Sequence, residues 1–171
     1  MKKILLTGYM ASGKTTIALL LSKAAGISYN DLDEIIENKT GKSVSQIFAE
    51  YGEIKFRRLE HQALKEFLDA ESSFVLSLGG GTPCYANNHE FLQRDDVVSV
   101  YLKASVQELV QRLREHDKHR PLIAGQKHDG LEEFVAKHIF DRSWFYHQAK
   151  HVVQVDGKLP EDIVNEIMSL Y

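Results

Sequence analysis

Short apolar runs alternate along the chain with longer segments in which apolar residues recur every three or four positions. The short runs predict strands at residues 4–7, 27–30, 74–78, 97–102 and 151–155. The longer segments predict helices at residues 15–25, 31–39, 44–51, 54–68, 106–114, 131–149 and 160–170. Alternation of this kind is typical of an α/β domain with a mainly parallel sheet, because parallel strands need a crossover connection, usually a helix.

Residues 115–130 follow neither period, and they hold a cluster of positive charge that includes Lys118, Arg120 and Lys127. A structureless segment of this length inside a compact domain is usually functional or disordered. We interpret it as a lid that closes over bound substrates and excludes water, with Arg120 reaching a phosphate chain.

Composition limits the possible partners and the compartment. The chain has 171 residues, of which 43% are hydrophobic and 26% charged, values typical of one globular domain. The net charge of −3 gives no reason to expect nucleic acid as the main partner. The single cysteine, Cys84, excludes an internal disulfide, and we see neither a signal peptide nor a membrane-spanning apolar run. We expect a cytoplasmic protein that binds no membrane, take it as a monomer, and expect Cys84 to be an ordinary semi-buried side chain.

Residues 8–15, Gly-Tyr-Met-Ala-Ser-Gly-Lys-Thr, match the phosphate-binding pattern G-x-x-x-x-G-K-[ST] between a predicted strand and a predicted helix. The backbone N–H groups of such a loop converge on phosphate oxygens, and the positive end of the following helix points at the same anion. Lys14 would neutralise charge on the β- and γ-phosphates, and the Thr15 hydroxyl could ligate Mg²⁺. The sequence therefore predicts an ATP site in a phosphoryl-transfer enzyme. Its expected nucleotide-binding residues are Gly8, Ala11, Ser12, Gly13, Lys14, Thr15 and Thr16.

Two carboxylates, Asp31 and Asp33, follow the second predicted strand. In extended backbone, residues two apart point the same way, so both side chains can face the crevice beyond the strand ends, where ligands of open α/β sheets bind. One of them could hold the Mg²⁺ shell and the other a substrate hydroxyl. Alternatively, Asp31 caps the helix that it precedes, since aspartate is a favoured N-cap residue.

Further motifs stand in order along the chain. Residues 56–60 read Phe-Arg-Arg-Leu-Glu on a predicted helix, and residues 78–83 read Leu-Gly-Gly-Gly-Thr-Pro after a predicted strand. Residues 120–122 read Arg-Pro-Leu in the basic segment, and residues 142–149 read Arg-Ser-Trp-Phe-Tyr-His-Gln-Ala. Together with the phosphate-binding loop, this ordered set resembles the shikimate kinase family over essentially the whole chain.

The resemblance implies a P-loop fold of the nucleoside-monophosphate-kinase-like type, with a five-stranded parallel sheet flanked by helices and a mobile lid at about residues 115–130. It also implies ATP-dependent phosphorylation of the 3-hydroxyl of shikimate, with Mg²⁺, so the expected partners are these small molecules. Asp31 looks like the aspartate that orders the Mg²⁺ shell, with Thr15 as the other metal-side residue. Arg120 looks like the lid arginine that reaches the phosphates, and Arg112 and Pro160 resemble the pair that flanks adenine.

On the acceptor side, the resemblance assigns Asp33 to the attacking hydroxyl. Arg57 and Arg142 would grip the shikimate carboxylate, a task for which planar guanidinium groups are suited. Glu60 lies three residues after Arg57 on the same helix face, so we expect it to hold that arginine in place. The backbone of the triple glycine would line the sugar-like ring. The expected substrate-binding residues are thus Asp33, Arg57, Gly79, Gly80, Gly81 and Arg142, and the expected catalytic residues are Lys14, Asp33 and Arg120.

The chain departs from the family's pattern at several positions. Ala11 stands where many members have glycine, and we expect tolerance because the position need not have a positive φ. Thr15 replaces the commoner serine but keeps the hydroxyl, and Ala18 replaces a common glycine, which favours its helix. The strand end at residues 78–79 lacks the usual Walker B aspartate, which leaves Asp31 as the best carboxylate for the metal.

Two rival interpretations stay open. Another small-molecule kinase, such as a gluconate kinase or a nucleoside monophosphate kinase, would share the phosphate-binding loop and the lid. Such a kinase does not call for two arginines at these places together with Asp33 and the triple glycine. A non-enzymatic guanine-nucleotide switch should carry Asn-Lys-x-Asp, and the nearest match, Asn-Lys-Thr-Gly at residues 38–41, lacks the aspartate.

Overall fold

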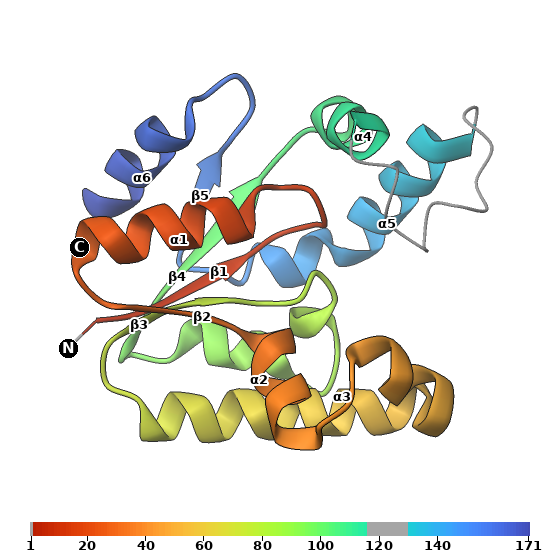
Figure 1. Ribbon diagram of the computed structural model, residues 1–171. Helices are drawn as coiled ribbons and strands as arrows, with labels where there is room; N and C mark the ends of the chain where they lie inside the picture. Colours follow the sequence, from red (N-terminus) through yellow and green to blue (C-terminus); the bar gives the residue numbers. More distant parts are fainter. Residues whose placement is uncertain (1, 116–129) are drawn as a thin grey trace.

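Five parallel strands form the centre of the structure, a computed structural model that describes residues 2–115 and 130–171 (Figure 1). The strands are β1 (Lys3–Thr7), β2 (Ser28–Asp31), β3 (Phe74–Ser77), β4 (Val97–Lys103) and β5 (His151–Gln154). Their order in the sheet is β2-β3-β1-β4-β5, and each neighbouring pair is parallel. The central strands β1 and β3 are runs of buried residues, as expected of strands covered by helices on both faces. The predicted α/β class and five-stranded parallel sheet are confirmed.

Helices cover both faces of the sheet. They are α1 (Lys14–Ala25), α2 (Leu32–Thr40), α3 (Val44–Ala70), α4 (Val106–Glu115), α5 (Leu131–Tyr146) and α6 (Pro160–Met168). Helices α1 and α6 pack against each other on one face, and α2 and α3 lie on the other (Figure 1). Within the described ranges, no helix is long and apolar enough to cross a membrane.

The predicted boundaries differ from the observed ones by a few residues. Gly52, at φ 76 and ψ 172, kinks α3 where two separate helices were expected. Helix α5 ends at Tyr146 rather than at residue 149, and α6 ends at Met168 rather than at residue 170. Two 3-10 helices, η1 (Thr82–Cys84) and η2 (Asn88–Gln93), occupy a stretch in which the sequence shows no period.

The strand register brings three chain segments to one edge of the sheet. Ser77 at the end of β3 lies between Asp31 at the end of β2 and Leu6 near the end of β1. Parallel strands end at the same edge, so the loop after β1, the start of α2 and the triple glycine after β3 meet there. This edge is where ligands bind in open α/β sheets.

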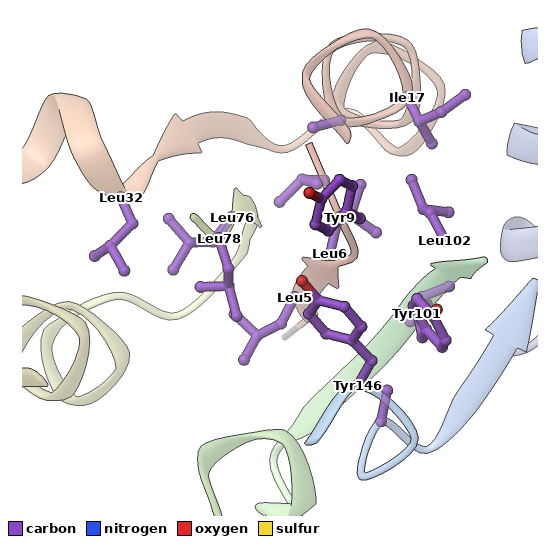
Figure 2. Close-up of a cluster of buried hydrophobic side chains, with 14 of the residues drawn as sticks. Leu5, Leu6, Tyr9, Ile17, Leu32, Leu76, Leu78, Tyr101, Leu102 and Tyr146 are labelled. Atoms are coloured by element: carbon purple, nitrogen blue, oxygen red, sulfur yellow. The ribbon is translucent and has the colours of Figure 1, made fainter. Parts of the chain in front are cut away.

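One cluster of buried apolar side chains holds these layers together (Figure 2). It contains Leu5 and Leu6 of β1, Ile17 of α1, Tyr101 of β4 and Tyr146 of α5. Burying a large apolar side chain contributes about 1.5–3 kcal/mol, so the cluster fixes the helices against the sheet. The side chains that form the site therefore stand on a rigid support.

Candidate active site

A cleft of about 890 Å³ opens at the carboxyl edge of the sheet. Its wall is built from the loop after β1, the start of α2, the end of β3, and parts of α4 and α6. The predicted site residues that line it are Ala11, Ser12, Gly13, Lys14, Thr15, Thr16, Asp31, Asp33, Gly79, Gly80, Arg112 and Pro160. Segments far apart in the sequence thus meet around a single cleft.

The phosphate-binding loop leads directly into the first turn of α1. That helix has no side-chain cap and no acidic residue in its first turn, so its first N–H groups and positive end are suited to an anion. Lys14 Nζ donates to the carbonyl oxygens of Gly8 and Tyr9, each at 2.8 Å, which keeps the ammonium beside the loop. A Cβ on Gly8 would lie 2.8 Å from the carbonyl oxygen of Leu102, so only glycine allows the loop to pack this closely on β4. These features fit a nucleotide phosphate chain.

The backbone at Ala11 corrects one expectation. Its φ is 64°, in the left-handed region, where a residue with a Cβ is disfavoured by roughly 1 kcal/mol or more. The expectation that this position does not require a positive φ is therefore wrong, and alanine is strained at a backbone conformation that glycine adopts freely. The carbonyl oxygen of Ala11 accepts from Arg112 Nη1 at 3.2 Å, and Arg112 Nε donates to Glu108 at 2.8 Å. Arg112 is thus held beside the loop.

The carboxyl group of Asp33 is more basic than that of an ordinary aspartate. Burial is the main cause and, with the neighbouring charges, raises its pKa from 3.8 to about 6. The negative charges of Asp31, Glu60 and Glu37 act in the same direction. The positive charge of Lys14 acts in the opposite direction. At neutral pH the group is ionised yet basic, which suits a hydrogen-bond acceptor for a substrate hydroxyl.

Asp31 both caps helix α2 and lines the cleft. Its Oδ1 accepts the backbone N–H of Asp33 at 2.9 Å, so Asp31 is the N-cap of α2, as the alternative interpretation held. The cap explains why α2 begins at Leu32, one residue later than predicted. Asp31 also lines the cleft, as does the exposed Thr15.

The oxygen atoms near Asp31 suit Mg²⁺, which needs few protein ligands, better than a metal ion that is coordinated entirely by side chains. Across residues 2–115 and 130–171, no three His, Cys, Asp or Glu side chains form a group that could hold a metal ion. In kinase sites, Mg²⁺ usually takes one or two protein oxygens and completes its shell with waters and substrate phosphates. The Asp31 carboxylate and the Thr15 hydroxyl, on the wall of one cleft, match that requirement.

Arg57 of α3 and Arg142 of α5 both reach the triple glycine. A Cβ on Gly81 would lie 2.9 Å from Arg57 Nη2, so any side chain at this position would displace the arginine. A Cβ on Gly80 would lie 3.9 Å from Arg142 Nη1. The two guanidinium groups therefore stand against neighbouring residues of one loop, although like charges repel.

Glu60 holds Arg57, as the spacing predicted. Glu60 is only 1% exposed, and its Oε2 accepts from Arg57 Nη1 at 2.8 Å. Its Oε1 accepts from the hydroxyl of Thr82 at 2.6 Å, which ties α3 to the residue after the triple glycine. A Cβ on Gly79 would lie 3.5 Å from Asp33 Oδ1 and 3.5 Å from Glu60 Oε1. Asp33 and the arginines thus share the triple glycine as a common neighbour.

The sequence analysis did not identify Thr82, Tyr85 and Tyr146 as residues that support the site. Thr82 follows the triple glycine directly, and Tyr146 lies four residues after Arg142, so these two spacings could have indicated their roles. Tyr85 gave no such signal. Lys158 also lines the cleft, where it pairs with Glu166 of α6 at 2.5 Å.

Some predicted residues cannot be placed. Arg120 and the expected lid, apart from its end residues Glu115 and Gly130, lie outside the described residues, so their roles stay predictions. Cys84 is half-buried, and burial raises the pKa of its thiol to about 11. At neutral pH the thiol is protonated, which argues against a nucleophile.

A phosphate-binding loop after the first strand, with Asp33 on α2 and two arginines on α3 and α5 beside the same triple glycine, is the arrangement of a P-loop kinase that acts on a small molecule. Comparison with known proteins identifies the family. The family model for shikimate kinase matches residues 10–171, and the chain belongs to the shikimate kinase family.

Individual relatives agree with this assignment. The shikimate kinase of Flavobacterium psychrophilum is 53% identical over 98% of this chain and 97% of its own length. That of Flavobacterium johnsoniae is 49% identical over 99% of each chain. Among solved structures, shikimate kinase from Bacteroides thetaiotaomicron matches with a TM-score of 0.89 and 33% identity, covering 99% of this chain and 97% of that one. Shikimate kinase from Acinetobacter baumannii in complex with shikimate matches with a TM-score of 0.86 and 32% identity, covering 99% and 92%.

One rival family shares the architecture. A gluconokinase from Sinorhizobium meliloti matches with a TM-score of 0.61 but 16% identity over 98% of this chain and 90% of that one, a likeness of fold alone. The fold by itself therefore does not separate the two kinases. The family match over residues 10–171 carries that distinction.

Proposed function

We propose that this protein transfers the γ-phosphoryl group of ATP to the 3-hydroxyl of shikimate, giving shikimate 3-phosphate and ADP, with Mg²⁺ as the metal cofactor. The observation that carries the proposal is that Asp33, Arg57 and Arg142 converge on the triple glycine at the edge of the nucleotide cleft. One basic carboxylate and two guanidinium groups suit an acceptor that offers a hydroxyl and a carboxylate. Family membership supports shikimate as that acceptor.

On the nucleotide side, we assign the phosphates to the backbone N–H groups of the loop and the first turn of α1. Lys14 would leave the carbonyl oxygens of its own loop and turn to the β- and γ-phosphates when ATP binds. Thr15 and Asp31 would hold Mg²⁺, which supplies positive charge at the phosphates when bound. Arg112 and Pro160, which also line the cleft, would flank the adenine.

On the acceptor side, we assign the carboxylate to Arg57 and Arg142, which orient the substrate ring over the triple glycine. Asp33 would accept a hydrogen bond from the 3-hydroxyl and take its proton as the new P–O bond forms. In a loose transition state that proton leaves late, so orientation by Asp33 matters more than basicity. Arg120 and Lys14 would neutralise charge that develops on the transferred group.

We further propose that the enzyme works as a cytoplasmic monomer with one catalytic domain, residues 1–171, and binds neither nucleic acid nor membranes. The net charge of −3 and the single cysteine support these points. Sedimentation equilibrium over a tenfold concentration range would test the monomer, since a dimer doubles the apparent mass.

A coupled assay of ADP release tests the reaction itself. ADP should form rapidly with ATP, Mg²⁺ and shikimate, and slowly when shikimate is left out or replaced by gluconate. Phosphorus NMR of the product should show a phosphate ester on the 3-position. Faster turnover with gluconate would favour the other kinase, and nucleotide binding with preference for GTP and no acceptor-dependent turnover would favour the switch.

A further inference from the structure

Each arginine on the acceptor side contacts a tyrosine, and the two contacts differ in chemistry. The Cζ atom of Arg57 lies 3.9 Å from the ring centroid of Tyr85. The hydroxyl of Tyr146 donates to the carbonyl oxygen of Gly80 at 2.5 Å, beside the guanidinium of Arg142, with which it interacts electrostatically. Neither tyrosine has a part in the phosphoryl-transfer chemistry described above.

We propose that Tyr85 and Tyr146 are positioning residues that hold Arg57 and Arg142 in the orientation that recognises the acceptor carboxylate, Tyr85 through its ring face and Tyr146 through its hydroxyl. The proposal rests on the proposed function, because it takes the acceptor to be a carboxylate gripped by these arginines.

Tyr85 completes the fixation of the Arg57 guanidinium. Nη1 is held by buried Glu60 at 2.8 Å, whereas among the described residues the other edge is hydrogen-bonded only to Glu53, at 3.4 Å from Nε and 3.5 Å from Nη2. Glu53 is half-exposed, so this edge is weakly held and can be taken over by a ligand carboxylate. The face of the Tyr85 ring lies 3.9 Å from Cζ of the group, and this cation–π contact restrains the guanidinium, which a planar two-pronged contact requires.

Tyr146 ties Arg142 to the triple glycine. It lies four residues after Arg142 on α5, on the same face of the helix, and is fully buried against Tyr101 with ring centroids 5.1 Å apart (Figure 2). Burial raises the pKa of Tyr146, so its hydroxyl stays protonated and donates to Gly80. The same oxygen can accept from a guanidinium N–H, so one hydroxyl can fix the positions of both the Gly80 carbonyl and the Arg142 guanidinium.

The Tyr146 contact also reaches the nucleotide side. A Cβ on Gly80 would lie 3.5 Å from the backbone nitrogen of Met10 and 3.6 Å from the carbonyl oxygen of Gly8. The glycine that Tyr146 holds is therefore packed on the phosphate-binding loop. Arg142 is placed relative to the same loop that places the phosphates.

The different chemistry at the two tyrosines predicts opposite tolerance to phenylalanine. Tyr85→Phe keeps the ring and should keep the KM and Kd for shikimate within about twofold. Tyr85→Leu removes the ring face and should raise both about 3- to 10-fold, with the KM for ATP unchanged. Tyr51→Leu is the matched control, because Tyr51 covers Lys42 at 5.2 Å before the Gly52 kink of α3 and should change neither constant.

Tyr146→Phe keeps the ring in the core but removes the hydroxyl. It should raise the KM and Kd for shikimate about fivefold or more, since a buried carbonyl and a guanidinium both lose a partner. Tyr101→Phe is the matched control, because it removes a hydroxyl from the same stacked pair and should leave both constants unchanged. Melting temperatures of all variants show whether each change leaves the fold intact.

Calorimetric titration of shikimate, alongside turnover, separates the possible failures. If the wild-type enzyme neither binds nor phosphorylates shikimate, the proposed function is wrong. If it does both, but Tyr85→Leu and Tyr146→Phe match the wild type, the proposal is overturned and the function stands. An equal loss in Tyr85→Phe and Tyr85→Leu would overturn the role of the ring face. Equal shifts in the shikimate and ATP constants would overturn specific positioning in favour of a general loosening of the site.

Discussion

Replacing Asp33 with asparagine should stabilise the protein at pH 8 while greatly lowering its kinase turnover. The native structure raises the pKa of this carboxyl from 3.8 to about 6, first through burial and then through the neighbouring charges of Asp31 and Glu60. A raised pKa means that the native state holds the proton more tightly than the unfolded chain does. Ionisation therefore opposes folding, by an amount that is negligible below about pH 4, grows as the pH rises and is complete above about pH 6–7.

The magnitude follows from the size of this shift. About two pKa units at about 1.4 kcal/mol each give a cost of about 3 kcal/mol at pH 8, of which about half is present at pH 5. Asparagine is close in shape and carries no charge, so the variant avoids this cost, and 3 kcal/mol is an upper bound on the gain. For a domain of this size, that bound corresponds to a rise in melting temperature of roughly 6–12 °C.

Thermal unfolding followed by circular dichroism at pH 5 and pH 8 measures the effect. Glu34→Gln is the matched control, because Glu34 is exposed and lies beside Asp33 in the first turn of α2. Both carboxylates stabilise the positive N-terminal end of the helix to the same extent, so the control isolates the effect of burial. The control should lose a few tenths of a kcal/mol or nothing. Turnover of Asp33→Asn should fall about 10²- to 10⁴-fold with MgATP binding retained, as expected for a positioned acid–base group.

The pH dependence of the gain is the decisive part. A gain at pH 8 that exceeds the gain at pH 5 is the expected result. If Asp33→Asn lowers the melting temperature at both pH values, or raises it by the same amount at both, the carboxylate is not destabilising in the folded state. The account of its raised pKa would then be refuted, whatever happens to turnover.

Three further changes test other parts of the site. Lys14→Met should lower turnover about 10²-fold or more with the unliganded melting temperature nearly unchanged, because the ammonium acts on the phosphates, and near-normal turnover would contradict this. Ala11→Gly should raise the free energy of unfolding by up to about 1 kcal/mol, measured in urea, because it relieves a positive φ, whereas Ala18→Gly inside α1 should lower it by about 1 kcal/mol. Arg57→Lys should raise the KM for shikimate much more than that for ATP, because an ammonium cannot make the two-pronged contact, and equal changes in steady-state kinetics would speak against the clamp.

Local patterns were enough to predict the five strands, most of the helices, and a phosphate-binding loop between β1 and α1. The strand, loop and helix of the phosphate-binding motif are contiguous in the chain, so one stretch of sequence holds both the motif and the geometry that it needs. The N-cap role of Asp31 and the support of Arg57 by Glu60 also involve residues two or three apart, and both were anticipated for that reason. Local spacing predicts local contacts because the chain itself keeps such residues together.

The acceptor half depends on distances that no local pattern contains. Asp33, Arg57 and Arg142 come from three helices, and they meet because β2, β3 and β1 end at one edge and because α3 and α5 pack beside the loop that follows β3. That these three residues belong to one site was inferred from a family resemblance, since spacing along the chain does not tell which helices and strand ends lie close together.

The backbone conformation of Ala11 and the pKa of Asp33 could not be predicted from the sequence pattern either. The positive φ of Ala11 is set by how its loop packs between β1 and α1, and the expectation drawn for it was wrong. The raised pKa of Asp33 arises from burial and from charges on α2 and α3, and the contact of Tyr85 with Arg57 arises from the turn that follows η1. Each of these properties is determined by the packing of segments that are distant in the sequence, and that packing exists only in the folded protein.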